Sequence, residues 1–192
     1  MSTTVEQYRS AVLTTANQLT LLRIVFVPVF VILLVYDQLG WALMTFVAAG
    51  ITDVLDGVIA RRFGQKTRVG ACLDPIADKL LMTSSVVILS LPQMELANPI
   101  PRWLMIIIIS RDIFIMLFTL VLVLMTGFRI FPPSPYGKAS TVLQVVTVFA
   151  VLYCNWRGLP VPQLHVLFYM TGFMTAFSGM HYLVTRVVVQ SN

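Results

Sequence analysis

Charge is scarce in this sequence: Asp, Glu, Lys and Arg together make up 11% of its 192 residues, whereas hydrophobic residues make up 58%. A soluble domain has about a quarter charged residues and roughly half apolar ones. The shortage excludes an ordinary water-soluble enzyme, a disordered chain and a nucleic-acid-binding module with a polar surface. We therefore predict an integral membrane protein, whose net charge of +5 reflects its topology in a lipid bilayer and not nucleic acid as a partner.

Cysteine and targeting signals are scarce as well. Cys72 and Cys154 form no CxxC pair, so the pattern indicates neither a disulfide scaffold nor a zinc cluster. The N-terminal residues lack the basic start and short apolar core of a cleavable signal peptide, and they form no Arg-rich presequence. The absence of an Arg-rich presequence favours a bacterial protein. We predict an interfacial segment at residues 1–16 and a single membrane domain at residues 17–192.

Uncharged apolar runs of about 20 residues, the length that crosses a bilayer, recur along the chain. They predict an all-α integral membrane fold with six transmembrane helices. Polar or Gly- and Pro-containing segments separate the six, whose expected ranges are 19–36, 41–61, 73–91, 102–125, 139–155 and 164–187.

Basic residues favour one orientation of these spans. With the N-terminus inside, nine Lys and Arg residues flank the inner ends, and Arg102 and Arg157 flank the outer ones. Trp41, Trp103 and Trp156 all fall at predicted outer ends, where indole rings prefer the membrane interface. The pattern predicts both termini inside and an active site on the cytoplasmic side of the bacterial cell membrane.

Acidic residues inside the predicted spans need compensation, because a carboxylate in hydrocarbon costs about 2.5–3.5 kcal/mol even on a lenient scale. Asp53 and Asp56 are three residues apart, and Asp74 and Asp78 four, so each pair shares a helix face. A short polar loop joins the two spans, so an antiparallel arrangement would bring all four carboxylates together. Hard divalent cations suit such a cluster, and two ions about 4 Å apart suit phosphoryl transfer.

Two other interpretations of these aspartates stay open. They could be packing features, protonated or paired with Lys79 and Arg61, or they could line the path of an ion or proton transporter. Transporters often have two matching halves, and no second half with equivalent acids is visible in the sequence.

Residues 53–78 fit the pattern D-x2-D-G-x2-A-R-x8-G-x3-D-x3-D at all eight fixed positions. This segment resembles the signature of the CDP-alcohol phosphatidyltransferases. Residues 17–23 and 137–144 resemble the N-x-L-T-x-x-R and G-K-x-x-T-x-x-Q patterns of the phosphatidylglycerophosphate synthase branch, so the similarity covers residues 15–150. The resemblance implies a six-helix membrane enzyme that displaces CMP from a CDP-linked lipid.

The resemblance also implies a role for each matching residue. Asp53, Asp56 and Asp74 are expected to hold two divalent ions, Mg²⁺ or Mn²⁺. Asp78 is expected to be the general base, with a share in metal binding. The residues expected at the CDP group are Asp53, Asp56, Gly57, Ala60, Arg61, Gly70 and Asp74, with Thr20 and Arg23 as weaker candidates. We expect direct displacement without a covalent intermediate.

Arg111 and Lys138 suggest an anionic acceptor, because Arg grips phosphate in a fork and Lys acts as a point charge. The resemblance places both at the acceptor's phosphate in the glycerophosphate-using branch. We therefore expect transfer from CDP-diacylglycerol to sn-glycerol 3-phosphate, giving phosphatidylglycerophosphate and CMP. The alternative for these residues is a structural Arg111–Asp112 pair with a Lys138 side chain that snorkels to the interface.

Asp112 keeps a second acceptor open. The glycerophosphate branch more often has Glu after this Arg, and residues 109–112 resemble cardiolipin synthases of the CDP-diacylglycerol type, whose acceptor is phosphatidylglycerol.

A separate hypothesis concerns Gly172 and Gly179 in the last span, since small residues allow close helix contacts in membranes. We expect these two glycines to support a homodimer.

Overall fold

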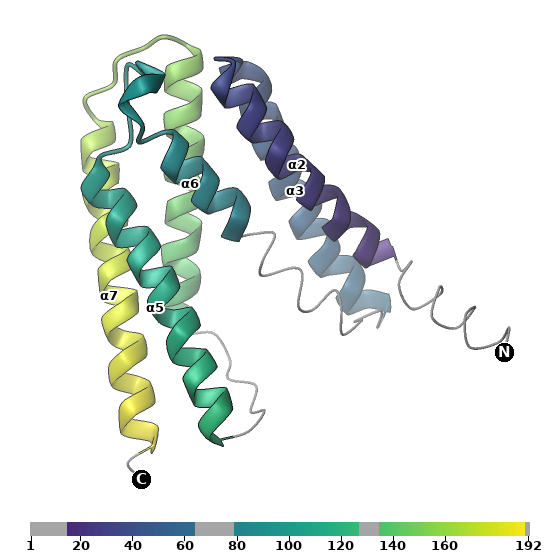
Figure 1. The fold of residues 1–192 in the computed structure, drawn as a ribbon, viewed down its shortest axis with the longest axis vertical. Coiled ribbons are helices and arrows are strands. Elements are labelled where there is room, and N and C mark those ends of the chain that lie inside the picture. Colours follow the sequence, from purple (N-terminus) through teal and green to yellow (C-terminus); the bar gives the residue numbers. More distant parts are fainter. Residues whose placement is uncertain (1–14, 64–78, 127–134, 191–192) are drawn as a thin grey trace, which may run out of the picture. The chain divides into compact units, whose positions relative to one another are not determined.

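The computed structural model describes residues 15–63, 79–126 and 135–190, and every regular element in these ranges is a helix (Figure 1). The predicted all-helical class is confirmed for this part of the chain. The chain forms two compact units, Met1–Ile88 and Leu89–Asn192, each with buried apolar residues of its own. The predicted division into an interfacial segment and one membrane domain stays a prediction.

The first unit is built on a hairpin of α2 (Thr15–Val35) and α3 (Leu39–Phe63), which pack against each other. Phe30 of α2 and Phe46 of α3 are buried in this contact, with ring centroids 5.9 Å apart. Ala42 and Ala49 are fully buried on α3, and their small side chains allow the two helices to approach closely. Residues 79–88 add a further helical segment to this unit.

A tight turn reverses the chain between α2 and α3. Asp37 adopts a left-handed conformation with φ of 55°, which its short polar side chain tolerates. The Asp37 N–H donates to the Leu34 carbonyl at 3.0 Å, and the Gln38 N–H donates to the Leu33 carbonyl at 2.8 Å. These two bonds satisfy the last carbonyls of α2 in a Schellman motif. The hairpin makes α2 and α3 antiparallel, as the sequence predicts.

The second unit contains three long helices, α5 (Arg102–Thr126), α6 (Pro135–Trp156) and α7 (Leu164–Gln190), after a short 3₁₀ turn η1 (Pro92–Met94). Helix α7 packs against both α5 and α6. The short connection at residues 157–163 makes α6 and α7 antiparallel (Figure 1). Helix α7 is therefore the element that both of the other long helices contact.

Aromatic contacts show that α5 and α7 run parallel. Near the start of both helices, Trp103 stacks on Tyr169 with ring centroids 5.3 Å apart. Further along both, Phe118 meets Tyr182 edge-on at 6.0 Å. This direction means that each position on α5 has a fixed neighbour on α7, a relation that determines the surroundings of Arg111.

The predicted spans at 102–125 and 164–187 agree closely with α5 and α7, but the span predicted from residue 139 begins four residues too late. Helix α6 starts at Pro135, whereas the sequence predicted that this proline belongs to the segment between two spans. Proline is favoured in the first turn of a helix, because its missing N–H has no intrahelical partner there. Gly137 and Lys138 therefore belong to the first turn of α6.

One helix among the described residues, α6, is long and apolar enough to cross a membrane. Shorter apolar helical stretches occur at Ile24–Val35, Leu39–Leu55 and Lys79–Ile88. This finding fixes neither the number of spans nor their orientation. The six spans and the inward-facing termini stay predictions.

Candidate active site

Four of the predicted metal and nucleotide residues lie on α3. Asp53, Asp56, Gly57 and Ala60 occupy positions i, i+3, i+4 and i+7 of this helix, a spacing that places all four on one face. The side chain of Asp53 is half-buried. The role of these four residues at a metal ion and a diphosphate stays a prediction.

Three further predicted site residues lie on helices of the first unit. Arg61 lies on α3, and Thr20 and Arg23 lie three residues apart on α2, the neighbouring helix of the same unit. The remaining predicted residues, Gly70, Asp74 and Asp78, lie outside the described residues, as does Cys72. In the part of the chain that is described, no group of three or more metal-binding side chains occurs. The convergence of the four aspartates therefore stays a prediction.

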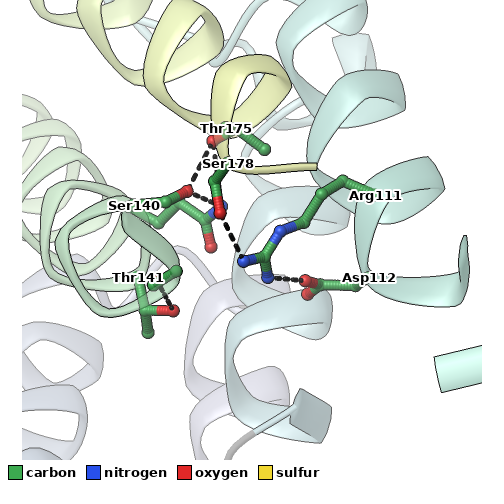
Figure 2. A network of polar contacts seen from close by, with 8 residues as sticks. Arg111, Asp112, Ser140, Thr141, Thr175 and Ser178 are labelled. Atoms are coloured by element: carbon green, nitrogen blue, oxygen red, sulfur yellow. Dashed lines mark hydrogen bonds and ion pairs between the residues drawn. The ribbon is translucent and has the colours of Figure 1, made fainter. Parts of the chain in front are cut away.

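Arg111 and Asp112, in the middle of α5, form an ion pair. The Arg111 Nη1 donates to Asp112 Oδ1 at 2.9 Å, and the two side chains are 11% and 12% exposed. On the other side, Arg111 Nη2 donates to Ser178 Oγ of α7 at 3.0 Å (Figure 2). The Arg111–Asp112 pair, which the sequence left open as a structural alternative to phosphate binding, is present. It uses one of the five N–H donors of the guanidinium.

The guanidinium of Arg111 keeps unused donor capacity. Its Nε is buried, and it has no hydrogen-bond partner among the described residues. Buried polar groups are nearly always paired, so an unpaired one calls for an explanation such as an acceptor supplied by water or a ligand. Arg111 can therefore bind an anion without giving up Asp112 or Ser178.

Lys138 has an exposed side chain on the first turn of α6. Two residues further along, Ser140 donates a hydrogen bond to Thr175 of α7 at 3.1 Å. Because α6 and α7 are antiparallel, Lys138 is level with the turn of α7 that follows Thr175 and contains Ser178. That turn also binds Arg111. The structure thus brings the two predicted acceptor residues to one level of the second unit.

A row of hydroxyl and amide groups joins α6 to α7, and the sequence pattern did not predict it. Gln144 is buried and its Nε2 donates to Thr175 Oγ1 at 3.0 Å. Further along, Thr147 and Thr171 share a hydrogen bond of 2.7 Å. Interhelical hydrogen bonds of this kind contribute roughly 0.6–2 kcal/mol each inside membranes. The spacing of three or four residues between polar positions on both helices was the available signal.

The G-K-x-x-T-x-x-Q segment of α6 therefore divides between two roles. Gln144 points into the α6–α7 contact, whereas Thr141 is exposed and its Oγ1 donates to the Gly137 carbonyl at 3.1 Å. Lys138 is the member of this segment with an exposed charge. The glutamine holds the helices together, and the lysine remains available for a ligand.

An asparagine pair fastens the loops at the opposite end of this unit. The Asn98 N–H donates to Asn155 Oδ1 at 2.9 Å, and Asn155 Nδ2 donates to the Asn98 carbonyl at 3.0 Å. Asn98 also bonds the backbone of Leu159 and Val161 through its side chain. A cavity of about 330 Å³ lies beside this pair, and no predicted site residue lines it.

Gly172 and Gly179 lie against α5 of the same chain. A Cβ at Gly172 would lie 2.6 Å from the Trp103 ring, and one at Gly179 would lie 3.4 Å from the Cγ of Arg111. The predicted homodimer contact of these glycines stays a prediction. Within the chain, Gly172 makes room for the Trp103 ring and Gly179 for the stem of Arg111.

The chain is similar to a known protein family and to several curated proteins. The family described as CDP-alcohol phosphatidyltransferase matches residues 13–184. A CDP-diacylglycerol–glycerol-3-phosphate 3-phosphatidyltransferase from Bacillus subtilis (strain 168) is 33% identical over 184 residues, which cover 86% of this chain and 91% of that protein. A probable cardiolipin synthase (CMP-forming) from Drosophila melanogaster is 34% identical over 201 residues, with 95% of this chain covered.

A third relative is a probable phosphatidylglycerophosphate synthase from Mycobacterium tuberculosis, 36% identical over 148 residues and 73% of this chain. The matched segments span 60% of the length of the Drosophila protein and 66% of that of the mycobacterial one. In the Bacillus protein the likeness extends over nearly the whole length.

Proposed function

The chain belongs to the CDP-alcohol phosphatidyltransferase family, and from this membership we propose that it transfers the phosphatidyl group of CDP-diacylglycerol to sn-glycerol 3-phosphate. The products are phosphatidylglycerophosphate and CMP. The observation that carries the proposal is the likeness to the Bacillus glycerol-3-phosphate 3-phosphatidyltransferase over 91% of that protein's length. Family membership makes the chain a transferase of phospholipid synthesis and replaces the transporter interpretation of its aspartates.

The leaving-group half of the reaction is assigned to the first unit. Asp53 and Asp56 fit a divalent cation, because they are hard oxygen donors on one face of α3. Asp74 and Asp78 would complete a site for two ions, Mg²⁺ or Mn²⁺. When bound, such ions supply charge neutralisation at the pyrophosphate and at the departing CMP.

The CDP group would lie along the same stripe of α3. Gly57 and Ala60 are small residues, which suit the close approach of a diphosphate to the helix, and Arg61 would offer it a positive charge. Gly70 belongs to the same proposed nucleotide site. Thr20 and Arg23 of α2 are further candidates there, because α2 packs against α3.

Proton transfer is assigned to Asp78. Its carboxylate takes the proton from the attacking hydroxyl of the acceptor while the hydroxyl oxygen forms a bond to the lipid-side phosphorus. The bond from this phosphorus to the CMP oxygen breaks, and CMP leaves with the electron pair. A positioned base of this kind contributes roughly 10²–10⁴-fold to the rate.

The acceptor's phosphate is assigned to Arg111 and Lys138 of the second unit. The support for this assignment is that both lie at one level of the bundle and that Arg111 keeps an unpaired buried donor. A phosphate there would receive a forked contact from the guanidinium and a point charge from the ammonium group.

We place the protein in the bacterial cell membrane with six spans, both termini inside and the site on the cytoplasmic side. Large apolar side chains support a lipid environment, because many of them are exposed on the described helices. On α7, Phe173 is 73% exposed and Met180 67% exposed. Such surfaces are unfavourable in water and favourable against acyl chains.

Cardiolipin synthesis is the second candidate function. Two observations favour it: the likeness to the Drosophila cardiolipin synthase over 95% of this chain, and Asp112 directly after Arg111. Its acceptor, phosphatidylglycerol, also presents a phosphate, so Arg111 and Lys138 would bind that acceptor as well.

Acceptor turnover decides between the two functions. The full-length protein, purified in detergent, is given labelled CDP-diacylglycerol with glycerol 3-phosphate, phosphatidylglycerol or glycerol, and release of CMP is followed. We expect glycerol 3-phosphate to exceed glycerol by at least roughly 100-fold in kcat/KM, because glycerol lacks the phosphate and each lost charged contact costs about 1.5–3 kcal/mol. We also expect glycerol 3-phosphate to be used in preference to phosphatidylglycerol. Turnover with phosphatidylglycerol but not with glycerol 3-phosphate would favour the second candidate.

A further inference from the structure

The guanidinium of Arg111 is held at both ends by side chains of different charge. Asp112 accepts from Nη1 at 2.9 Å, and Ser178 of α7 accepts from Nη2 at 3.0 Å. Figure 2 shows the guanidinium between these two groups. An arginine side chain has several rotatable bonds, and two anchored N–H groups are enough to fix the plane of its head group.

On the basis of the proposed function, we propose that Ser178 is a positioning residue for the acceptor's phosphate, acting through Arg111. Forked binding of phosphate requires the guanidinium plane to point in one direction before the ligand arrives. Asp112 alone holds one nitrogen and leaves the head group free to pivot. Ser178 holds the second nitrogen and removes that freedom.

The neutral hydroxyl of Ser178 suits this task better than a second carboxylate. Asp112 already offsets part of the positive charge of Arg111. A further acid would weaken the attraction for a phosphate, whereas a hydroxyl accepts the hydrogen bond without adding charge. Ser178 is 1% exposed, so water does not compete for this contact.

Helix α7 also links Ser178 to Lys138, the second cationic residue of the proposed acceptor site. One turn before Ser178, Thr175 binds Ser140 and Gln144 of α6, the helix that carries Lys138. The same face of α7 therefore fixes Arg111 through Ser178 and fixes the height of Lys138 through Thr175. The last helix, which carries no charged group of the proposed site, sets the separation between the two cations.

Steady-state kinetics of the full-length protein in detergent micelles tests this role. For Ser178→Ala we expect KM for glycerol 3-phosphate to rise roughly tenfold, the effect of losing one hydrogen bond to a charged group, while KM for CDP-diacylglycerol stays within about twofold. Ser178→Thr keeps the hydroxyl and should restore KM to within about threefold of the original value.

Thr147→Ala is the matched control. It removes a buried hydroxyl that α6 shares with α7 but leaves the Arg111–Ser178 and Ser140–Thr175 bonds intact. A purely structural effect would change both alanine variants alike. The proposal is overturned if Ser178→Ala leaves the acceptor KM unchanged, lowers kcat with both KM values unaffected, or matches Thr147→Ala. If the protein proves to use phosphatidylglycerol instead, the same comparison with that acceptor tests Ser178. A wrong acceptor can therefore be distinguished from a wrong role for Ser178.

Discussion

The Asp78→Asn variant is expected to lose roughly 10²–10⁴-fold in kcat at saturating concentrations of both substrates. An asparagine keeps the size of the side chain but cannot take the proton of the attacking hydroxyl. The nucleophile would then be the neutral hydroxyl alone. Release of labelled CMP from CDP-diacylglycerol measures the effect directly.

Asp37→Asn is the matched control for this substitution. Asp37 lies in the turn between α2 and α3 with φ of 55°, a conformation that asparagine adopts readily. Its turnover should therefore equal that of the unmodified protein. An Asp78→Asn variant with undiminished kcat would show that the proton goes elsewhere.

Replacement of Arg111 by glutamine is expected to lower kcat/KM for glycerol 3-phosphate by about 10²-fold or more, because truncating one member of a buried charge pair costs about 2–5 kcal/mol. Part of this loss would come from acceptor binding. Another part would come from the loss of the ion pair with Asp112, whose side chain is 12% exposed. The kinetics of the single variant do not separate the two parts.

The double variant Arg111→Gln/Asp112→Asn separates them. It removes both charges together, so no carboxylate loses its counter-charge, and the unfolding temperature in detergent should return toward the original value. The kcat/KM for glycerol 3-phosphate should stay low, because the phosphate still lacks its fork. Recovery of acceptor turnover in the double variant would mean that Arg111 is a structural partner of Asp112 and no phosphate ligand.

Long apolar runs made most described helices predictable. The bounds of α5 and α7 follow from where charge and proline interrupt the runs, and they agree with the predicted spans to within a few residues. Pro135 was misjudged, because proline stops a helix that has begun but favours the first turn of a new one. A run of prolines alone does not tell these cases apart.

Which helices meet was not predictable from the same runs. Gly172 indicates a close approach, but the sequence does not identify the neighbouring side chain, which in the structure is Trp103 of α5. Gln144 and Thr175 are single polar residues in apolar helices, so their pairing becomes evident only when α6 and α7 are placed side by side. Packing partners depend on the whole bundle and not on local pattern.

The residues of the candidate site likewise include some that the sequence predicted and one that it did not. Residue type and position in the chain made Arg111 and Lys138 candidates for the acceptor site, because isolated cations in apolar spans are costly and few. Ser178 escaped notice, since a serine in an apolar helix has many uses and its hydrogen bond to Arg111 joins residues 67 apart in sequence. The stripe of Asp53, Asp56, Gly57 and Ala60 needed only the period of one helix.

Counting bound ions tests most directly whether the four aspartates of residues 53–78 hold divalent cations for phosphatidyl transfer. The full-length protein is freed of metal with a chelator and titrated with Mn²⁺ in the presence of CDP-diacylglycerol, while electron paramagnetic resonance follows the bound ion. We predict about two Mn²⁺ per chain, as in two-metal phosphoryl-transfer sites, with fewer in Asp56→Asn and no CMP release until metal is restored. Undiminished CMP release after chelation, or unchanged Mn²⁺ binding in Asp56→Asn, would contradict this assignment.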